Sequence, residues 1–275
     1  MKNRIIFGSI AAVLLVALVG WGTPTMMLVV TASLAALGYY EYDRLFFTVR
    51  SKKRTLGMIF LISSSVVIMA ERPAWAAVGQ WICFVAIGVS HVFRSNRQGD
   101  FYKITREMAL MILAYLYLVG LFGFLVPIVK LNPGAGRHYL FLLLLIVFIG
   151  DTAAYFVGLT IGKHRLATLL SPKKSIEGCI GALVASVLVA WGWLYFMNQK
   201  PLSHEYVWKI LLMSPVASGL AQLGDLFESM FKRSQLQKDS GVFLPGHGGI
   251  LDRVDGLALV SPVYYFYLYF LIERV

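Results

Sequence analysis

The chain has 275 residues, of which 58% are hydrophobic and 14% are charged, and its mean hydropathy is +0.71. A soluble domain has about half apolar and about a quarter charged residues, so this composition excludes an ordinary soluble globular protein. The net charge of +11 would suit a nucleic-acid-binding protein, but in a membrane protein it reflects basic loops on one side. We therefore expect no nucleic-acid partner.

Nine apolar segments follow one another along the chain, and most are long enough to cross a hydrocarbon core about 30 Å thick. Lipid offers no hydrogen-bond partner to an open strand, so each segment is predicted to be a helix. The expected spans are residues 5–21, 24–42, 55–70, 75–94, 106–129, 138–161, 178–197, 207–230 and 254–272. With no internal repeat or long linker, we expect one all-α integral membrane domain, with variable spans over 1–140 and a motif-bearing catalytic half over 141–275.

Basic residues are distributed unevenly between the two sides of this arrangement. Of the 25 lysines and arginines, 19 fall in loops on one side, which the positive-inside rule assigns to the cytoplasm. The N-terminus is therefore predicted inside and the C-terminus outside, in the inner (cytoplasmic) membrane if the protein is bacterial. The longer loops on the cytoplasmic side, 162–177 and 231–253, can meet there.

A polar face is predicted at the inner end of the eighth span. Asp225, Glu228, Ser229 and Lys232 stand at positions i, i+3, i+4 and i+7, which share one side of a helix. Charged groups at a membrane boundary are costly unless they bind something polar. This face is therefore the first candidate for a functional site.

A second pair of acids follows a glycine-rich turn. Asp252 and Asp255 are three residues apart at the expected start of the ninth helix, and residues 244–249, LPGHGG, can turn sharply before them. Clustered carboxylates repel one another unless a cation neutralises them, and Mg²⁺ prefers carboxylate and phosphate oxygens. The pattern indicates metal-assisted chemistry on a phosphate compound, with one or two ions held by Asp225, Asp252 and Asp255.

Residues 229–255 resemble the signature of the phosphatidate cytidylyltransferases (CDP-diacylglycerol synthases). The matching run is SMFKR, four residues, KDSG, two residues, and LPGHGGILDRVD. Residues 151–158, DTAAYFVG, and 171–178, SPKKSIEG, are similar to the family's other polar stretch. The resemblance covers about residues 145–265, and the first 140 residues match only as hydrophobic spans, with a weak echo at residues 38–41.

The resemblance implies that CTP and phosphatidic acid react to give CDP-diacylglycerol and pyrophosphate, with Mg²⁺ as cofactor and a place for a second cation. The partners would be CTP, phosphatidic acid and membrane lipids; a homodimer is left open. The catalytic residues implied are Asp225, Lys232, Arg233, Lys238, Asp239, His247, Asp252 and Asp255. The substrate-binding residues implied are Asp151, Ser171, Lys173, Lys174, Ser175, Glu177, Ser229, Gly248, Gly249 and Arg253. Phosphate contacts are expected from Lys173, Lys174, Lys232, Arg233 and Lys238.

Several residues have simpler interpretations. His247 is equally well explained as a cap of the glycine turn. Asp151 lies halfway along a span, where an acid is expensive, so a site role is favoured over a structural hydrogen bond. Glu41 and Asp43 end the second span beside a basic run, and both are expected to anchor that span at the membrane interface.

Two other functions stay open. A CTP-dependent lipid kinase of the polyprenol or phytol type would transfer the γ-phosphoryl group instead, but the complete run from 238 to 255 argues against it. An ion-coupled transporter could use Asp151 and Asp225 as ion sites. The acids gather at one end of the protein, however, and the sequence has no inverted repeat.

Overall fold

The computed structural model describes residues 2–47, 51–98, 100–132, 134–197, 204–237, 240–241 and 248–271. Over these residues the chain is almost entirely helical, so the all-α prediction is confirmed. The helices are α1 (Lys2–Trp21), α2 (Pro24–Phe46), α3 (Lys52–Glu71), α4 (Ala76–Gln98), α5 (Phe101–Gly123), α6 (Leu125–Leu131), α7 (Gly136–Thr160), α8 (Ile176–Met197), α9 (His204–Ser234) and α10 (Leu251–Leu271), with a short 3₁₀ turn, η1 (Pro73–Trp75).

Each of the nine expected spans coincides with one long helix, and α6 adds a short helix directly after α5. Among the described residues, five stretches are long and apolar enough to cross a membrane: Lys52–Glu71, Phe101–Leu131, Gly136–Thr160, Ile176–Phe196 and Val207–Ser234. Shorter apolar stretches lie in α1 and α4. The chain is therefore an integral membrane protein, while the count of nine crossings stays a prediction.

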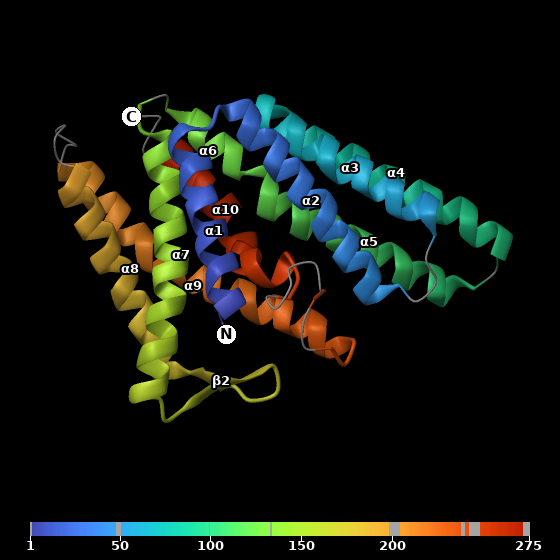
Figure 1. The fold of residues 1–275 in the computed structure, drawn as a ribbon. Coiled ribbons are helices and arrows are strands. Elements are labelled where there is room, and N and C mark those ends of the chain that lie inside the picture. Colours follow the sequence, from blue (N-terminus) through green and yellow to red (C-terminus); the bar gives the residue numbers. More distant parts are fainter. Residues whose placement is uncertain are drawn as a thin grey trace.

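The helices form two groups joined by α9 and α10 (Figure 1). Helices α1 and α8 pack against α7 on one side, and α2 and α3 pack against α5 on the other. Helix α9 packs against α8 and α10, and α10 in turn packs against α5. The first 140 residues are thus in direct contact with the motif-bearing half.

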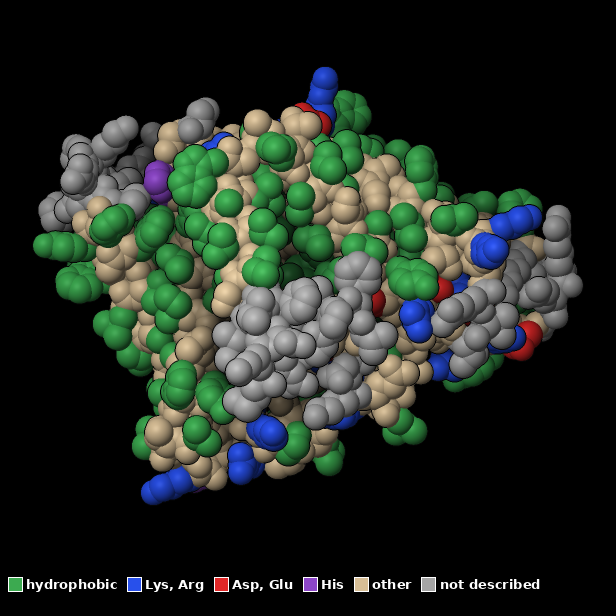
Figure 2. All heavy atoms as spheres, viewed as in Figure 1, with side chains coloured by type: hydrophobic (Ala, Val, Ile, Leu, Met, Phe, Trp, Pro, Cys, Tyr) green, Lys and Arg blue, Asp and Glu red, His purple; other side chains and the backbone are tan. Residues whose placement is uncertain are grey.

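Large apolar side chains cover much of the outer surface (Figure 2). Helix α8 is a clear example, since its exposed residues include Ile180, Val184, Leu188, Trp191 and Tyr195, which recur along one side of the helix. An exposed apolar stripe of this length is unfavourable in water but suits contact with lipid. The exposed surface therefore agrees with a membrane environment.

A small β hairpin occupies the segment 162–177, which the sequence predicted only as a loop. Strand β1 (Arg165–Ala167) pairs antiparallel with β2 (Ser171–Ser175), and the register is irregular between Arg165 and Ala167. Short strands with polar residues give a weak period-2 signal, so the sequence alone does not indicate this hairpin. In Figure 1 it lies at the end of the molecule where α1 begins.

Helices α9 and α10 cross unusually closely. A Cβ atom at Gly224 would lie 2.5 Å from the backbone oxygen of Asp255, and one at Gly256 would lie 3.5 Å from the backbone oxygen of Ala221. Small residues at a crossing let two helix backbones approach in a membrane protein. This contact brings the beginning of α10 beside the acidic face of α9.

Helix α9 ends in a Schellman motif. Leu236 adopts a left-handed conformation with φ of 56°, and the amide of Gln237 donates to the carbonyl of Lys232 at 2.9 Å. The side chain of Leu236 is 97% exposed. The motif turns the chain away immediately after Lys232 and Arg233, so both bases stay at the end of α9.

Candidate functional site

The predicted polar face of α9 is confirmed. Ser229 donates from Oγ to Asp225 Oδ1 at 3.4 Å, and Lys232 Nζ lies 2.6 Å from Glu228 Oε2. These contacts join residues four apart, which are neighbours on a helix surface. One side of α9 therefore carries two carboxylates, a hydroxyl and an ammonium group.

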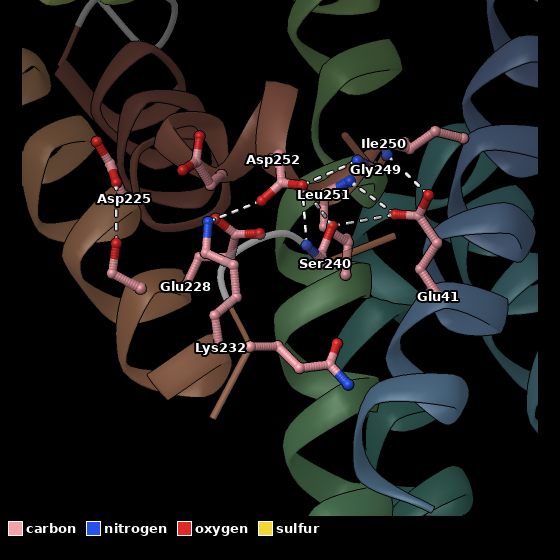
Figure 3. Close-up of polar contacts among 12 residues, drawn as sticks. Glu41, Asp225, Glu228, Lys232, Ser240, Gly249, Ile250, Leu251 and Asp252 are labelled. Atoms are coloured by element: carbon pink, nitrogen blue, oxygen red, sulfur yellow. Dashed lines mark hydrogen bonds and ion pairs between the residues drawn. The ribbon is translucent and has the colours of Figure 1, made fainter. Parts of the chain in front are cut away.

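Lys232 links α9 to α10. Its Nζ also lies 2.7 Å from Asp252 Oδ1, and its side chain is only 13% exposed (Figure 3). Removing one partner of a largely buried ion pair leaves an uncompensated charge, which is strongly destabilising. Lys232 is therefore held by carboxylates of two helices, and its positive charge offsets the negative charge of Glu228 and Asp252.

Asp252 closes the base of the glycine-rich turn. Its Oδ2 accepts hydrogen bonds from the amide of Ser240 at 2.9 Å, from Ser240 Oγ at 3.1 Å and from the amide of Gly249 at 2.8 Å. Gly248 has φ of +80°, and a Cβ there would lie 2.7 Å from Asp252 Oδ2. A glycine is thus required both for the backbone conformation and for the close approach of this carboxylate.

The remaining acids gather beside this link. The charges of Asp225 and Lys232 act on Asp255, the charge of Asp255 acts on Glu228, and the charges of Asp225 and Lys174 act on Asp151. Glu228 Oε1 is buried and has no hydrogen-bond partner among the described residues. For Asp151, a predicted site residue, the only acid of α9 among these charges is Asp225. Neighbouring carboxylates repel one another, so a positive charge beside them is favourable.

The three predicted metal ligands differ in their surroundings. Both oxygens of Asp252 have donors, and so have both oxygens of Asp225, from Ser229 and Lys174. Asp255 Oδ1 accepts from the amide of Gly256. Within the described ranges, no three acidic, histidine or cysteine side chains are arranged to hold one ion. The donor chemistry suits a hard cation at Asp225 and Asp255. Asp252 fits that role less well, because its two oxygens already accept from four donors, against two for Asp225.

The hairpin meets α9, as the two longer inner loops were expected to do. Lys174 Nζ lies 2.6 Å from Asp225 Oδ2, and Arg233 Nε donates to the backbone oxygen of Leu170 at 3.4 Å. Lys173, next in the strand, is exposed. Successive side chains of a strand point to opposite faces, so only one lysine of this pair contacts the acids.

Two predicted substrate-binding residues have partners within the protein. Ser175 is buried before α8 and accepts a hydrogen bond from the amide of Gly178 at 3.1 Å, as an N-cap residue does. Glu177 accepts from the amides of Lys163 and His164, and from His164 Nδ1 at 2.6 Å. Both residues fix the base of the hairpin and so hold Lys174 in place.

Other predicted residues are located as follows. Ser171 begins β2, where it pairs with Ala167, and Arg253 is exposed in the first turn of α10. Gly249 supplies an amide to Asp252. Lys238, Asp239 and His247 lie outside the described residues.

The expectation that Glu41 and Asp43 anchor α2 at the membrane interface is wrong. Both are buried; Asp43 pairs with Arg54 at 3.0 Å. Glu41 reaches the glycine-rich turn, where it accepts hydrogen bonds from the amides of Ile250 and Leu251 (Figure 3). The only signal for this in the sequence was the weak family echo at residues 38–41, because nothing local shows which distant backbone a carboxylate will contact.

Known proteins match this chain over most of its length. The family described as "Cytidylyltransferase family" matches residues 2–271. A phosphatidate cytidylyltransferase of Staphylococcus aureus (strain COL) is 35% identical over 211 residues, which is 75% of this chain and 76% of that protein. Proteins of the same name from Staphylococcus haemolyticus and Staphylococcus epidermidis are 45% identical over 128 residues, 46% of this chain and about half of theirs.

Proposed function

The chain belongs to the cytidylyltransferase family, and we propose that it transfers the cytidylyl group of CTP to phosphatidic acid. The products would be CDP-diacylglycerol and pyrophosphate. The observation that carries this proposal is that two bases, Lys174 and Lys232, lie beside two acids, Asp225 and Asp255, near one end of α9. The bases can bind the phosphates of a nucleotide, and the acids can hold its cation. The names of the staphylococcal relatives support the same reaction.

The reaction needs no nucleophile from the protein. A phosphate oxygen of phosphatidic acid attacks the α-phosphorus of CTP; the new P–O bond forms as the bond from the α-phosphorus to the bridging oxygen breaks, and pyrophosphate leaves with that electron pair. Lys174 and Arg233, which approach the site from the hairpin and from α9, are suited to bind the phosphates. Positioning and charge stabilisation then supply most of the rate.

Mg²⁺ is the proposed cofactor, with a second cation as a further option. Asp225 and Asp255 are the ligands we propose for it, because the close crossing brings the backbone of Asp255 against Gly224, the residue next to Asp225. When bound, the metal would offset the negative charge that develops on the leaving pyrophosphate. Asp252 is assigned instead to holding Lys232 and the glycine-rich turn, although the sequence pattern grouped it with the other two acids.

The proposed site faces the cytoplasm. Helix α1 begins at the same end of the molecule as the hairpin and the site-bearing end of α9 (Figure 1), which supports an inner position for all three if the N-terminus is inside. CTP is a cytosolic nucleotide, so this orientation gives the site access to it. An inside N-terminus, an outside C-terminus and an inner-membrane location in a bacterium remain part of the proposal.

The test is an assay of the purified full-length protein in detergent with phosphatidic acid and CTP labelled in either the α- or the γ-phosphate. Cytidylyl transfer places the α-label in the lipid and releases the γ-label as pyrophosphate. A lipid kinase of the polyprenol or phytol type would place the γ-label in the lipid. A transporter would label no lipid at all, and either of these outcomes would refute the proposed reaction.

A further inference from the structure

Glu41 is a buried acid of α2 that contacts two parts of the chain roughly 200 residues further on. Its Oε1 accepts a hydrogen bond from the amide of Ile250 at 2.9 Å, and its Oε2 accepts from the amide of Leu251 at 3.1 Å. Ser240 Oγ donates to the same Oε2 at 3.4 Å. Only 4% of this residue is exposed, so the three donors take the place of water.

The chemistry of these contacts requires a carboxylate. Ile250 directly precedes α10 and Leu251 is its first residue. The first amides at a helix start have no partner within the helix and carry partial positive charge. A carboxylate can accept from several such donors at once, because it has two oxygens and no hydrogen of its own. Glu41 therefore caps α10 from a different helix.

Glycines allow the acid to come this close. A Cβ atom at Gly241 would lie 2.9 Å from Glu41 Oε1, and one at Gly249 would lie 2.5 Å from Oε2. Gly38, one turn earlier in α2, lets that helix approach Leu251, since a Cβ there would lie 3.2 Å from its side chain. Any side chain at Gly241 or Gly249 would push the glycine-rich turn away from α2.

Two acids thus hold the two stems of the same loop. One stem is residues 240–241 and the other is residues 248–251. Asp252 binds both stems from α10, through Ser240 and Gly249, and Glu41 binds both stems from α2, through Ser240 and the first amides of α10. The chain between the stems includes His247, and Lys238 and Asp239 directly precede the first stem.

We propose that Glu41 is a positioning residue for this loop, so that the variable N-terminal half sets the geometry of the motif-bearing half. The inference rests on the proposed function, since the loop is the part of the family signature assigned to CTP chemistry. Glu41 does not touch the substrates in this assignment. It acts through Ser240, Ile250 and Leu251, whose backbone it holds in place.

The experiment compares Glu41→Gln and Glu41→Ala with a matched control, Asp43→Asn. Asp43 lies on the same helix and is 2% exposed. Its carboxylate also binds other residues, but these are Arg54 and Thr55 of α3 and not the loop. Each full-length variant is measured by thermal melting, by kcat and KM for CTP, and by hydrogen exchange of the peptide that contains residues 248–251.

Glu41→Gln keeps the size of the side chain but has only one acceptor oxygen, so it loses at least one of the three contacts. We expect faster exchange at residues 248–251 and a fall in kcat/KM for CTP of the order of 100-fold, as a displacement of about 1 Å in a catalytic site can produce. Asp43→Asn should melt at least as early as Glu41→Gln and yet keep normal exchange in this peptide and a nearly normal rate per folded molecule.

Equal losses of rate in the two variants, scaling with their melting temperatures, would reduce Glu41 to a structural residue and overturn the proposal. Unchanged exchange at residues 248–251 in both Glu41 variants would also overturn it. Wild-type protein that labels no lipid in the CTP assay would instead refute the proposed function, and the exchange measurement would still decide whether Glu41 holds the loop.

Discussion

Lys174 of the β hairpin and Asp225 of α9 form an ion pair of 2.6 Å, although they are 51 positions apart and the whole of α8 lies between them. The pair places a base from one polar segment of the chain directly on the acid of the other. Asp225 is also a proposed metal ligand, and Lys174 a proposed phosphate contact. A bound nucleotide would therefore bring phosphates to Lys174 and a cation to Asp225, so each partner of the pair would keep a neighbour of opposite charge.

Substitution of the two neighbouring lysines tests this relationship. We expect Lys174→Ala to lower kcat/KM for CTP by roughly tenfold or more, because a charged hydrogen bond worth about 1.5–3 kcal/mol is lost. Lys173→Ala should have a much smaller effect, since Lys173 is exposed and its strand position points it away from Lys174. Steady-state kinetics with varied CTP give the answer; equal effects, or none in the double variant, would contradict the assignment.

Asp225→Asn and Asp255→Asn should each lower turnover by about 100-fold or more while the protein stays folded in detergent. Asn keeps the shape of Asp but loses the charge that attracts a hard cation. Part of the loss should be recovered at higher Mg²⁺, and EDTA should abolish wild-type activity until Mg²⁺ is restored. A Mg²⁺ titration with thermal melting as the folding control measures this. Normal turnover at low Mg²⁺ would remove that residue from the metal site.

Asp252→Asn should also lower turnover, but for a different reason. Its oxygens bind Lys232, Ser240 and Gly249, so the variant should lose the support of the loop rather than a ligand. We expect its loss to be independent of Mg²⁺ concentration and accompanied by faster hydrogen exchange near Gly249. Recovery of Asp252→Asn at high Mg²⁺ would return this residue to the group of metal ligands that the sequence pattern predicted.

Gly224→Ala should separate α9 from α10. The new methyl group would lie 2.5 Å from the backbone oxygen of Asp255, a contact that forces one helix to move. Overpacking of this kind costs about 1–3 kcal/mol. Gly219→Ala on the same helix is the matched control, because its nearest neighbour outside the helix would be 3.8 Å away. Melting and activity should fall only for Gly224→Ala; similar behaviour of both variants would argue against the close crossing as a requirement.

Cysteine labelling in intact cells or sealed vesicles tests the orientation. The labelled residue must be exposed to the reagent. Ser240 is only 4% exposed, whereas Leu236 at the end of α9 is freely exposed. With Cys83 and Cys179 replaced, Leu236→Cys should react with a membrane-impermeant reagent only from the cytoplasmic side. Gly134→Cys, in the exposed turn before α7, should react only from the outside. The reverse pattern would overturn the predicted topology.

The sequence by itself determined the local features of this protein. Hydropathy over about 20 residues predicted a membrane protein of helices, because lipid forces each span to satisfy its own backbone hydrogen bonds. The spacing of Asp225, Glu228, Ser229 and Lys232 predicted their common face, since 3.6 residues per turn is a property of any α-helix. Residues 229–255 were sufficient to indicate the family, because that signature is contiguous in the chain.

Only the tertiary structure decided which distant groups meet. Sequence spacing grouped Asp252 with Asp225 and Asp255, but the folded chain places both of its oxygens on Lys232, Ser240 and Gly249. It also carries Glu41, which the sequence assigned to the membrane interface, to the start of α10. Whether a carboxylate binds a cation, an ammonium group or a helix N-terminus depends on which donors the packing of other helices brings within about 3 Å, and no local pattern contains that information.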